Sequence, residues 1–253
     1  MNVNSNKYTF IFAIVMVVVV ATALAFAATS LAERQGINHR TEKMQDILNA
    51  IGLKSVEQDG EEVFLSRELA EENYEKYIVE ELSLRADGSV EESVNAFDVN
   101  LGQELKKPVD EQVFPLYIAE MNDERYYIIP LYGSGLWDAI WGYISLKEDV
   151  NTIGGAIFDH KGETAGLGAE ITKDWFQDSF KDEKILDKEG NLVGISVVKG
   201  YQGGNDKDDH AVDGISGSTL TANGVEDMIQ ERLKNYVPYF NEHTDVKIQY
   251  SSK

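Results

Sequence analysis

Nine residues near the C-terminal end, DGISGSTLT at 213–221, combine glycines with side-chain hydroxyls. Glycines let a backbone approach an anion closely, and hydroxyls and free N–H groups at a helix start can hold it. Ser, Thr and Gly are also the usual residues of a turn that leads into a helix, which is the simpler interpretation of the local chemistry. Neither the Lys of a P-loop nor a GxGxxG after a strand is present, so neither standard nucleotide motif applies.

A helix is predicted directly after this stretch. Asn223 is a candidate N-cap, and Glu226 three residues later completes the pattern of a capping box. Glu226 and Asp227 place acidic charge in the first turn, as the helix dipole favours. Apolar residues then recur at helical spacing: Val225, Met228, Ile229, Leu233, Tyr236 and Val237.

Composition excludes several classes of function. The 253 residues are 43% hydrophobic, enough for one well-buried domain, and the formal net charge of -21 disfavours nucleic acid as a partner. There is no cysteine, which rules out disulfides, thiolate metal sites and cysteine nucleophiles. The four histidines form no close pair, and the aspartates of residues 206–209 lack the spacing and terminal Glu of a calcium loop, so we predict no metal site.

Residues 10–28 are apolar apart from Thr22. As a helix they would be about 28 Å long, close to the hydrocarbon thickness of a bilayer. A cleaved signal peptide is the alternative, because Ala25-Phe26-Ala27 resembles a cleavage site, but the apolar run is long and its basic start is only Lys7. We therefore expect an uncleaved membrane anchor in residues 1–30 and a soluble domain in residues 31–253.

Local charge leaves the orientation of this anchor open. Lys7 and the amino terminus lie on one side of the span, and Arg34, Arg40 and Lys43 lie on the other. The positive-inside rule therefore does not place the C-terminal domain outside the cell, although long domains can be translocated regardless of such small biases.

After the anchor, strand and helix patterns are mixed and no Pro-, Gly- or Ser-rich linker divides them, so the predicted fold class is α+β. A helical face of Met44, Ile47, Leu48 and Ile51 ends at Gly52. The remaining expected elements are a helix at 66–77, an Asp87-Gly88 turn, an irregular polar stretch at 86–110, and strands at 78–84, 114–120, 126–131, 141–146, 151–158 and 191–199.

Two further stretches could lie near a ligand. The aromatic and glycine-rich segment around Trp137 and Trp141 suggests a close backbone approach or a flat ligand, although isolated tryptophans are more simply interpreted as core residues. The loop at 160–170 contains three glycines, and it is either a turn or a set of N–H groups presented to a ring or phosphate.

Three stretches together resemble the FMN-binding domain of the C subunit of the sodium-translocating NADH:quinone reductase. They are GLWDAIWGYISL at 135–146, NTIGGAIFDHKGETAGLGAEI at 151–171 and HAVDGISGSTLTANGV at 210–225. The N-terminal span fits this family too, whereas residues 54–110 match it only in layout. The resemblance implies an FMN-binding part at about residues 112–240.

DGISGST resembles the Asp-Gly-x-Ser/Thr-Gly-Ala-Thr signature of proteins that carry FMN through a phosphoester to threonine. The resemblance implies covalent attachment at Thr219, with Ser218 in place of the usual alanine and Thr221 as a further hydroxyl. A separate flavin transferase would perform the attachment. It is expected to recognise these residues: Asp213, Gly214, Ser216, Gly217 and Thr219.

The same resemblance implies the remaining flavin contacts. The loop at 163–168 would lie against the isoalloxazine ring, Leu136 and Trp137 would line the same pocket, and Lys199 would lie near the ring or phosphate. The loop contributes Glu163, Thr164, Gly166, Leu167 and Gly168.

The function implied is electron transfer, with no catalytic side chains in this chain. Electrons would arrive from an iron–sulfur centre in neighbouring membrane subunits and leave to a covalent FMN in the B subunit, and the soluble domain would face the periplasm from the inner membrane. The G subunit of the Rnf complex shares the anchor, the ETxGLG loop and the flavinylation signature. The long stretch at 52–130 favours the quinone reductase over the Rnf complex. A membrane-anchored flavin-binding module without redox turnover is the remaining alternative.

Overall fold

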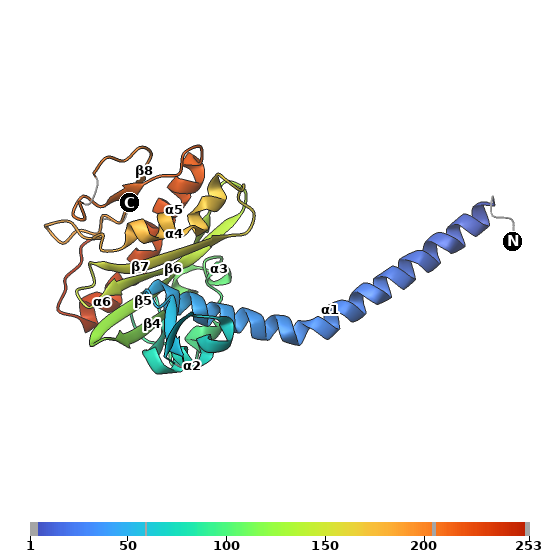
Figure 1. Cartoon of the computed structure of the whole chain (residues 1–253), viewed down its shortest axis with the longest axis horizontal. Helices are drawn as coiled ribbons and strands as arrows, with labels where there is room; N and C mark the ends of the chain where they lie inside the picture. The colour runs from blue at the N-terminus through green and yellow to red at the C-terminus, as the bar shows by residue number, and fades with distance from the viewer. Residues whose placement is uncertain (1–4, 59, 204–205, 251–253) are drawn as a thin grey trace. The chain divides into compact units, whose positions relative to one another are not determined.

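The computed structural model describes residues 5–58, 60–203 and 206–250. The chain divides into two units, Met1–Lys43 and Met44–Lys253. The first consists almost entirely of helix, and the second contains all the strands (Figure 1).

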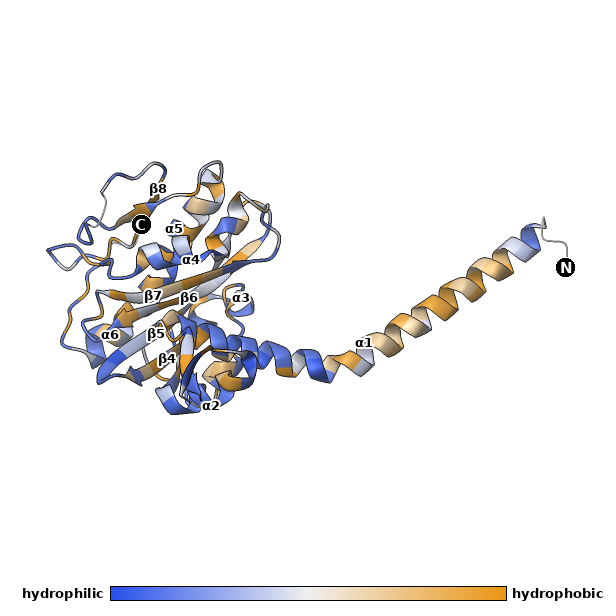
Figure 2. Ribbon diagram, viewed as in Figure 1, coloured by the Kyte–Doolittle hydropathy of each residue, from blue (hydrophilic) through white to orange (hydrophobic). Residues whose placement is uncertain are grey.

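Helix α1 (Asn6–Ala50) includes the predicted apolar span. It is long and apolar enough to cross a membrane, and no other helix of the described residues is (Figure 2). Its last turns belong to the second unit, where Met44, Ile47 and Leu48 are buried, as the apolar face predicts. The helix ends before Gly52, whose φ of 84° lies in the left-handed region that glycine adopts at helix C-termini.

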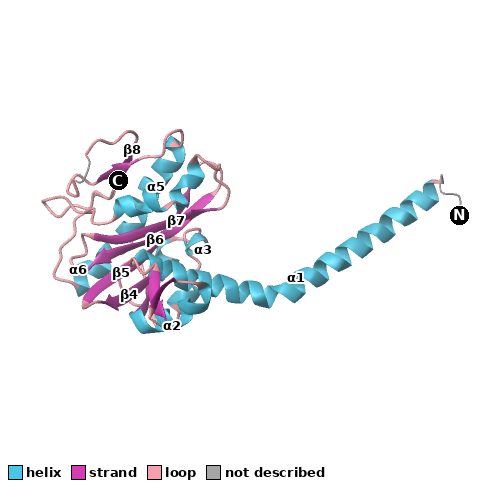
Figure 3. Cartoon of the chain, viewed as in Figure 1, coloured by secondary structure: helices cyan, strands magenta, loops and turns pink. Residues whose placement is uncertain are grey.

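The second unit is built on a five-stranded antiparallel sheet in which each strand pairs with the next along the chain (Figure 3). Its strands are β3 (Ile78–Leu84), β4 (Phe114–Met121), β5 (Glu124–Ser134), β6 (Ala139–Lys147) and β7 (Ile153–His160). Successive side chains point to opposite faces, so Tyr117 and Ile118 of β4 enter two different hydrophobic cores. Both faces of this sheet are therefore covered, consistent with the α+β class.

The core on one face contains α5 (Thr219–Lys234) and α6 (Val237–His243), together with α4 (Asp174–Gln177) and the parallel pair β8 (Ser196–Val198) and β9 (Ala211–Asp213). Tyr236 is fully buried there, and its hydroxyl donates to Pro115 O of β4 at 2.9 Å. This contact fixes the end of α5 to the sheet. The six apolar residues predicted for the helical stripe after residue 224 are all buried.

The core on the other face contains the end of α1 and α2 (Arg67–Tyr77), beside the hairpin β1 (Ser55–Gln58) and β2 (Glu61–Phe64). Short helical turns complete the unit: η1 (Ala96–Asp98), α3 (Leu101–Glu104), η2 (Val109–Glu111), η3 (Gly168–Thr172) and η4 (Asp178–Phe180). Three of them lie within or beside the stretch predicted to be irregular, so that stretch is more ordered than its polar composition indicates.

Most of the expected strands are present, but one is much shorter. The turn between β4 and β5 has positive φ at Asn122 and Asp123, as a two-residue hairpin requires. The strand expected at 191–199 is reduced to Ser196–Val198, because Asn191 and Leu192 form isolated bridges with other segments.

The predicted start of the last long helix is wrong. Helix α5 begins at Thr219, so Asn223 and Gly224 lie inside it. A Cβ at position 224 would lie 2.3 Å from Ser134 O, so this glycine is required by close packing against β5. Glu226 forms no capping box, because its Oε2 accepts a hydrogen bond from Val197 N of β8 at 3.0 Å.

Candidate functional site

Glu163 joins three segments that are far apart in the sequence. Its side chain is buried, with 7% of the residue exposed. Oε1 accepts a hydrogen bond from Trp137 N at 3.0 Å, and Oε2 accepts one from the hydroxyl of Thr221 at 2.7 Å. One carboxylate therefore connects the β5–β6 loop, the loop after β7 and the first turn of α5.

Two glycines make room for this carboxylate. A Cβ at Gly135 would lie 2.4 Å from Oε1 of Glu163, and a Cβ at Gly168 would lie 2.3 Å from Oε2. Any larger residue at either position would displace the acid. A third glycine, Gly217, has a φ of 83° and lies against Leu167, so the loop before α5 contacts the loop after β7.

Polar contacts hold the outer parts of the same loops together. Trp137 Nε1 donates to the Thr164 hydroxyl at 3.2 Å, and Lys161 Nζ lies 2.9 Å from Asp138. The Lys161 hydrogen bond, aided by the Ala139 N–H, lowers the pKa of Asp138. Both partners of this ion pair are exposed, so it orients the loops more than it stabilises them.

Three hydroxyls at the start of α5, those of Ser218, Thr219 and Thr221, have different environments. Thr219 is exposed, whereas Ser218 is 5% exposed and Thr221 is completely buried. The Thr221 hydroxyl is also engaged by Glu163. Among these three, Thr219 is the hydroxyl that a group in solvent can reach.

The N-terminus of α5 can bind an anion. Ser218 at the N-cap makes no side-chain capping bond, and the first turn contains no acidic residue. Within the described residues, the N–H groups of Thr219, Leu220 and Thr221 have no hydrogen-bond partner. Unpaired N–H groups at the positive end of a helix dipole are a favourable environment for an anion.

Asp213 stabilises the loop that leads to this helix. Its Oδ1 accepts hydrogen bonds from Gly200 N at 3.1 Å and Tyr201 N at 3.2 Å. Gly214 N donates to Val198 O at 2.9 Å. The ends of β8 and β9 are thereby joined. Lys199 lies exposed between these contacts, and no hydrogen bond within the described part of the chain links its side chain to the Glu163 loops.

Large apolar side chains are exposed on the same three segments. Trp137 is 68% exposed, so its interpretation as a core residue is wrong, and Trp141 is half-buried. The other exposed apolar residues of these segments are Leu136, Leu167 and Leu220. Apolar side chains left in solvent beside glycine-rich loops provide a surface for a flat apolar ring.

The structure thus brings together Glu163, Thr164, Gly168 and Trp137, all named from the sequence. Glu163 was expected to contact the flavin, but both of its carboxylate oxygens already accept hydrogen bonds inside the protein, where they hold the loops together. Sequence reasoning missed Gly135 and the contacts of Thr221. The repeated glycines at 135, 166 and 168 were the available signal for a crowded site.

Residues 135–234 match a family described as "FMN-binding domain", a range that contains all three loops and the whole of α5. This match defines the class of protein as a flavin-binding domain.

The C subunit of the Na(+)-translocating NADH-quinone reductase from Haemophilus ducreyi is 32% identical over 216 residues, which cover 79% of each chain. The C subunit from Neisseria meningitidis is 39% identical over 116 residues, 45% of this chain and 43% of that protein. The crystal structure of the C subunit from Parabacteroides distasonis has a TM-score of 0.71 and 36% identity, covering 83% of this chain and 96% of that one. The chain belongs to the family formed by the C subunits of the Na(+)-translocating NADH-quinone reductase.

Proposed function

We propose that this chain carries FMN through a phosphoester to Thr219 and passes electrons between other subunits of a sodium-translocating NADH:quinone reductase. The observation that carries the proposal is the exposed Thr219 hydroxyl at an uncapped helix N-terminus, within a match to the FMN-binding domain. Burial of Ser218 and Thr221 supports Thr219 over these two hydroxyls as the attachment residue.

The loop before α5 would hold the phosphate end of the flavin. Gly214, Ser216 and Gly217 keep this loop small, and Asp213 ties its base to the segment that follows β8. The N–H groups of the first helical turn would donate to phosphate oxygens. A separate flavin transferase would recognise this exposed loop and form the ester bond.

The isoalloxazine ring would lie against Leu136, Trp137 and Leu167, the exposed apolar residues of the other two loops. Gly166, which lies next to Leu167 with a φ of 74°, gives this loop its sharp turn. Lys199 would lie towards the phosphate side, because it follows β8 and its backbone N lies 3.2 Å from the Cβ position of Gly214.

FMN supplies the redox chemistry, since it can accept and release single electrons, while the protein supplies attachment, orientation and electrostatics. Glu163 would fix the spacing between the ring-binding loops and the acceptor helix. The bound flavin would stay accessible from solvent to partner subunits, which supply and accept the electrons.

The N-terminal helix would anchor the chain in the inner membrane, with the span at about residues 10–28 of an anchor at 1–30. The soluble domain of residues 31–253, with its FMN-binding part at about 112–240, would face the periplasm. Neighbouring membrane subunits of the reductase and the lipid bilayer are the partners in this arrangement, and sodium movement would belong to the complex.

The function is tested with the intact complex purified from its own membranes. Thr219→Val is expected to reduce NADH-dependent quinone reduction to background, whereas Thr219→Ser keeps a hydroxyl and is expected to retain part of it. Assembly of the complex is checked by subunit composition. A Thr219→Val complex that is fully assembled and fully active would overturn the proposal.

A further inference from the structure

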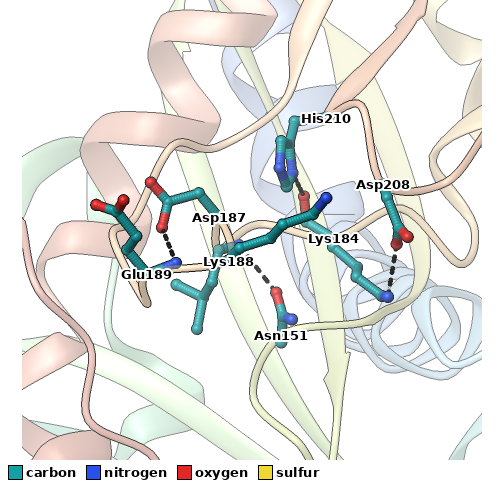
Figure 4. Close-up of a pocket in the computed structure, with 8 residues that line it drawn as sticks. Asn151, Lys184, Asp187, Lys188, Glu189, Asp208 and His210 are labelled. Carbon is teal, nitrogen blue, oxygen red and sulfur yellow. Dashed lines mark hydrogen bonds and ion pairs between the residues drawn. The ribbon is translucent and has the colours of Figure 1, made fainter.

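A pocket of about 430 Å³, shown in Figure 4, is lined by residues outside the three loops described above. It is lined by Lys184 and residues 186–189, by Asn151 from the turn before β7, and by Asp208 and His210 from the segment before β9. Two lysines, three carboxylates and one of the four histidines of the chain line this pocket.

Two carboxylates of the pocket are already engaged. Asp187 accepts hydrogen bonds from the backbone N–H groups of Glu189 and Asn191, at 2.8 and 2.9 Å, and from the Asn191 amide at 2.8 Å. Asp208 pairs with Lys184 Nζ at 2.6 Å, and this bond, aided by the charge of Lys188, lowers the pKa of Asp208. Glu189 is the remaining acid, and it is exposed.

The pocket has unused donors. Asn151 Oδ1 accepts from Leu186 N at 2.8 Å, which fixes the orientation of the amide and leaves Nδ2 free to donate. Lys188 extends across the pocket towards His210 in Figure 4, and its ammonium makes no ion pair or hydrogen bond with any described residue. His210 Nδ1 donates to Lys184 O at 2.6 Å, so the neutral ring has only an acceptor left at Nε2 and is not one of these donors.

We propose that this pocket binds an oxyanion group, either a phosphate or a carboxylate, between Lys188 Nζ and Asn151 Nδ2. Charge-assisted hydrogen bonds are the strongest that such a group makes, and both donors are otherwise unused. Lys184 is already paired with Asp208, so Lys188 is the cation of the pocket that remains for a bound oxyanion.

Strand β9 connects this pocket to the loop before α5. His210 immediately precedes β9, and its carbonyl accepts a hydrogen bond from Ser196 N of β8 at 2.8 Å. The other end of β9 is Asp213, which holds Gly200 and Tyr201. An oxyanion bound in this pocket would therefore lie at the end of the β8–β9 pair opposite the loop before α5.

Binding is measured by calorimetric titration of the full chain in detergent with sodium phosphate and, separately, sodium malonate. Sodium chloride replaces the titrant at matched ionic strength, because a chain of this charge responds to salt alone. We expect saturable binding of at least one titrant in the native chain. Tighter phosphate binding assigns the pocket to phosphate, and tighter malonate binding assigns it to carboxylate.

Two substitutions test the donors. Lys188→Gln removes the ammonium, and Asn151→Asp keeps the oxygen that accepts from Leu186 N but replaces the free donor with a negative charge. Each is expected to weaken binding at least about tenfold, the effect of losing one charge-assisted hydrogen bond. Lys181→Gln makes the same charge change at an exposed lysine outside the pocket and is expected to leave binding unchanged.

No saturable binding above the chloride control would overturn the proposal. Equal loss in Lys188→Gln and Lys181→Gln would also overturn it, because the effect would then be one of net charge. Thermal unfolding of each variant without titrant identifies any variant that fails to fold, and Asn151→Asp then provides an independent test.

Discussion

The hydroxyl of Thr221 donates to Oε2 of Glu163 across 2.7 Å, in a position from which solvent is excluded. Thr219 precedes it by two residues in the same helix, and two residues rotate an α-helix by about 200°. The two hydroxyls therefore face nearly opposite directions. One is held by the protein interior, and the other is presented to solvent.

Thr221→Val is expected to destabilise the chain. The substitution keeps the shape of the side chain but leaves a buried carboxylate oxygen without its donor, which costs about 1–3 kcal/mol. Thr221→Ser retains the hydroxyl and is expected to cost much less. Thermal unfolding in detergent compares the two variants. Equal stability of the Val and Ser variants would show that the hydrogen bond contributes little.

Gly168→Ala is expected to disturb the same contact from the other side. The added Cβ would lie 2.3 Å from Glu163 Oε2 and 2.6 Å from the Thr221 hydroxyl. Overpacking of this kind costs roughly 1–3 kcal/mol. Gly162→Ala is the matched control, since nothing lies within 4 Å of its Cβ position. The prediction fails if the two alanine variants unfold at the same temperature.

A buried ion pair outside the candidate site gives a prediction that depends on pH. Lys207 Nζ lies 2.7 Å from Oε1 of Glu183, whose side chain is 2% exposed, and burial raises the pKa of this carboxyl although Lys207 opposes the shift. An acid whose pKa is raised by folding binds its proton more tightly in the folded state. Ionisation of Glu183 therefore costs stability as pH rises through the folded pKa, and acidification recovers it.

Lys207→Met removes the cation and leaves this carboxylate unpaired. We expect the free energy of unfolding at neutral pH to fall by up to about 3 kcal/mol. This is the lower end of the range for broken buried pairs, because Lys207 is partly exposed. The difference from the native chain should shrink as pH falls and Glu183 becomes protonated. Unfolding is followed by denaturant titration at several pH values. If the difference in unfolding free energy between Lys207→Met and the native chain stays constant over these pH values, Glu183 is not the group responsible.

A substitution of Glu183, the other member of this ion pair, provides a control. Glu183→Gln removes the charge that Lys207 neutralises, so the double variant is expected to lose less than the sum of the two single losses. Strict additivity would mean that the two side chains do not interact energetically.

Local patterns predicted the elements that are stabilised by local signals. The strand at 78–84 and the helix ending at residue 77 have the expected bounds, and the expected Asp87-Gly88 turn is present, with a φ of 89° at Gly88. The covered face of α5 also follows from its apolar spacing. These features depend on residues close together in the sequence.

Contacts between distant segments were not predictable in this way. Glu226 has the spacing of a capping box, yet it is engaged by Val197 of β8, and Gly224 is required by the approach of β5. Glu163 and Thr221 are separated by 58 residues. Their hydrogen bond engages the Thr221 hydroxyl and so leaves Thr219 as the exposed threonine. No periodicity in a single sequence indicates a contact between residues so far apart.

Peptide mapping by mass spectrometry of the chain from its native membranes tests the attachment of FMN most directly. We predict that the peptide containing residues 213–221 carries the mass of FMN minus water, that fragmentation assigns it to Thr219, and that Thr219→Val abolishes it while Thr221→Val does not. An unmodified peptide from active membranes, or FMN located on Thr221, would contradict this prediction.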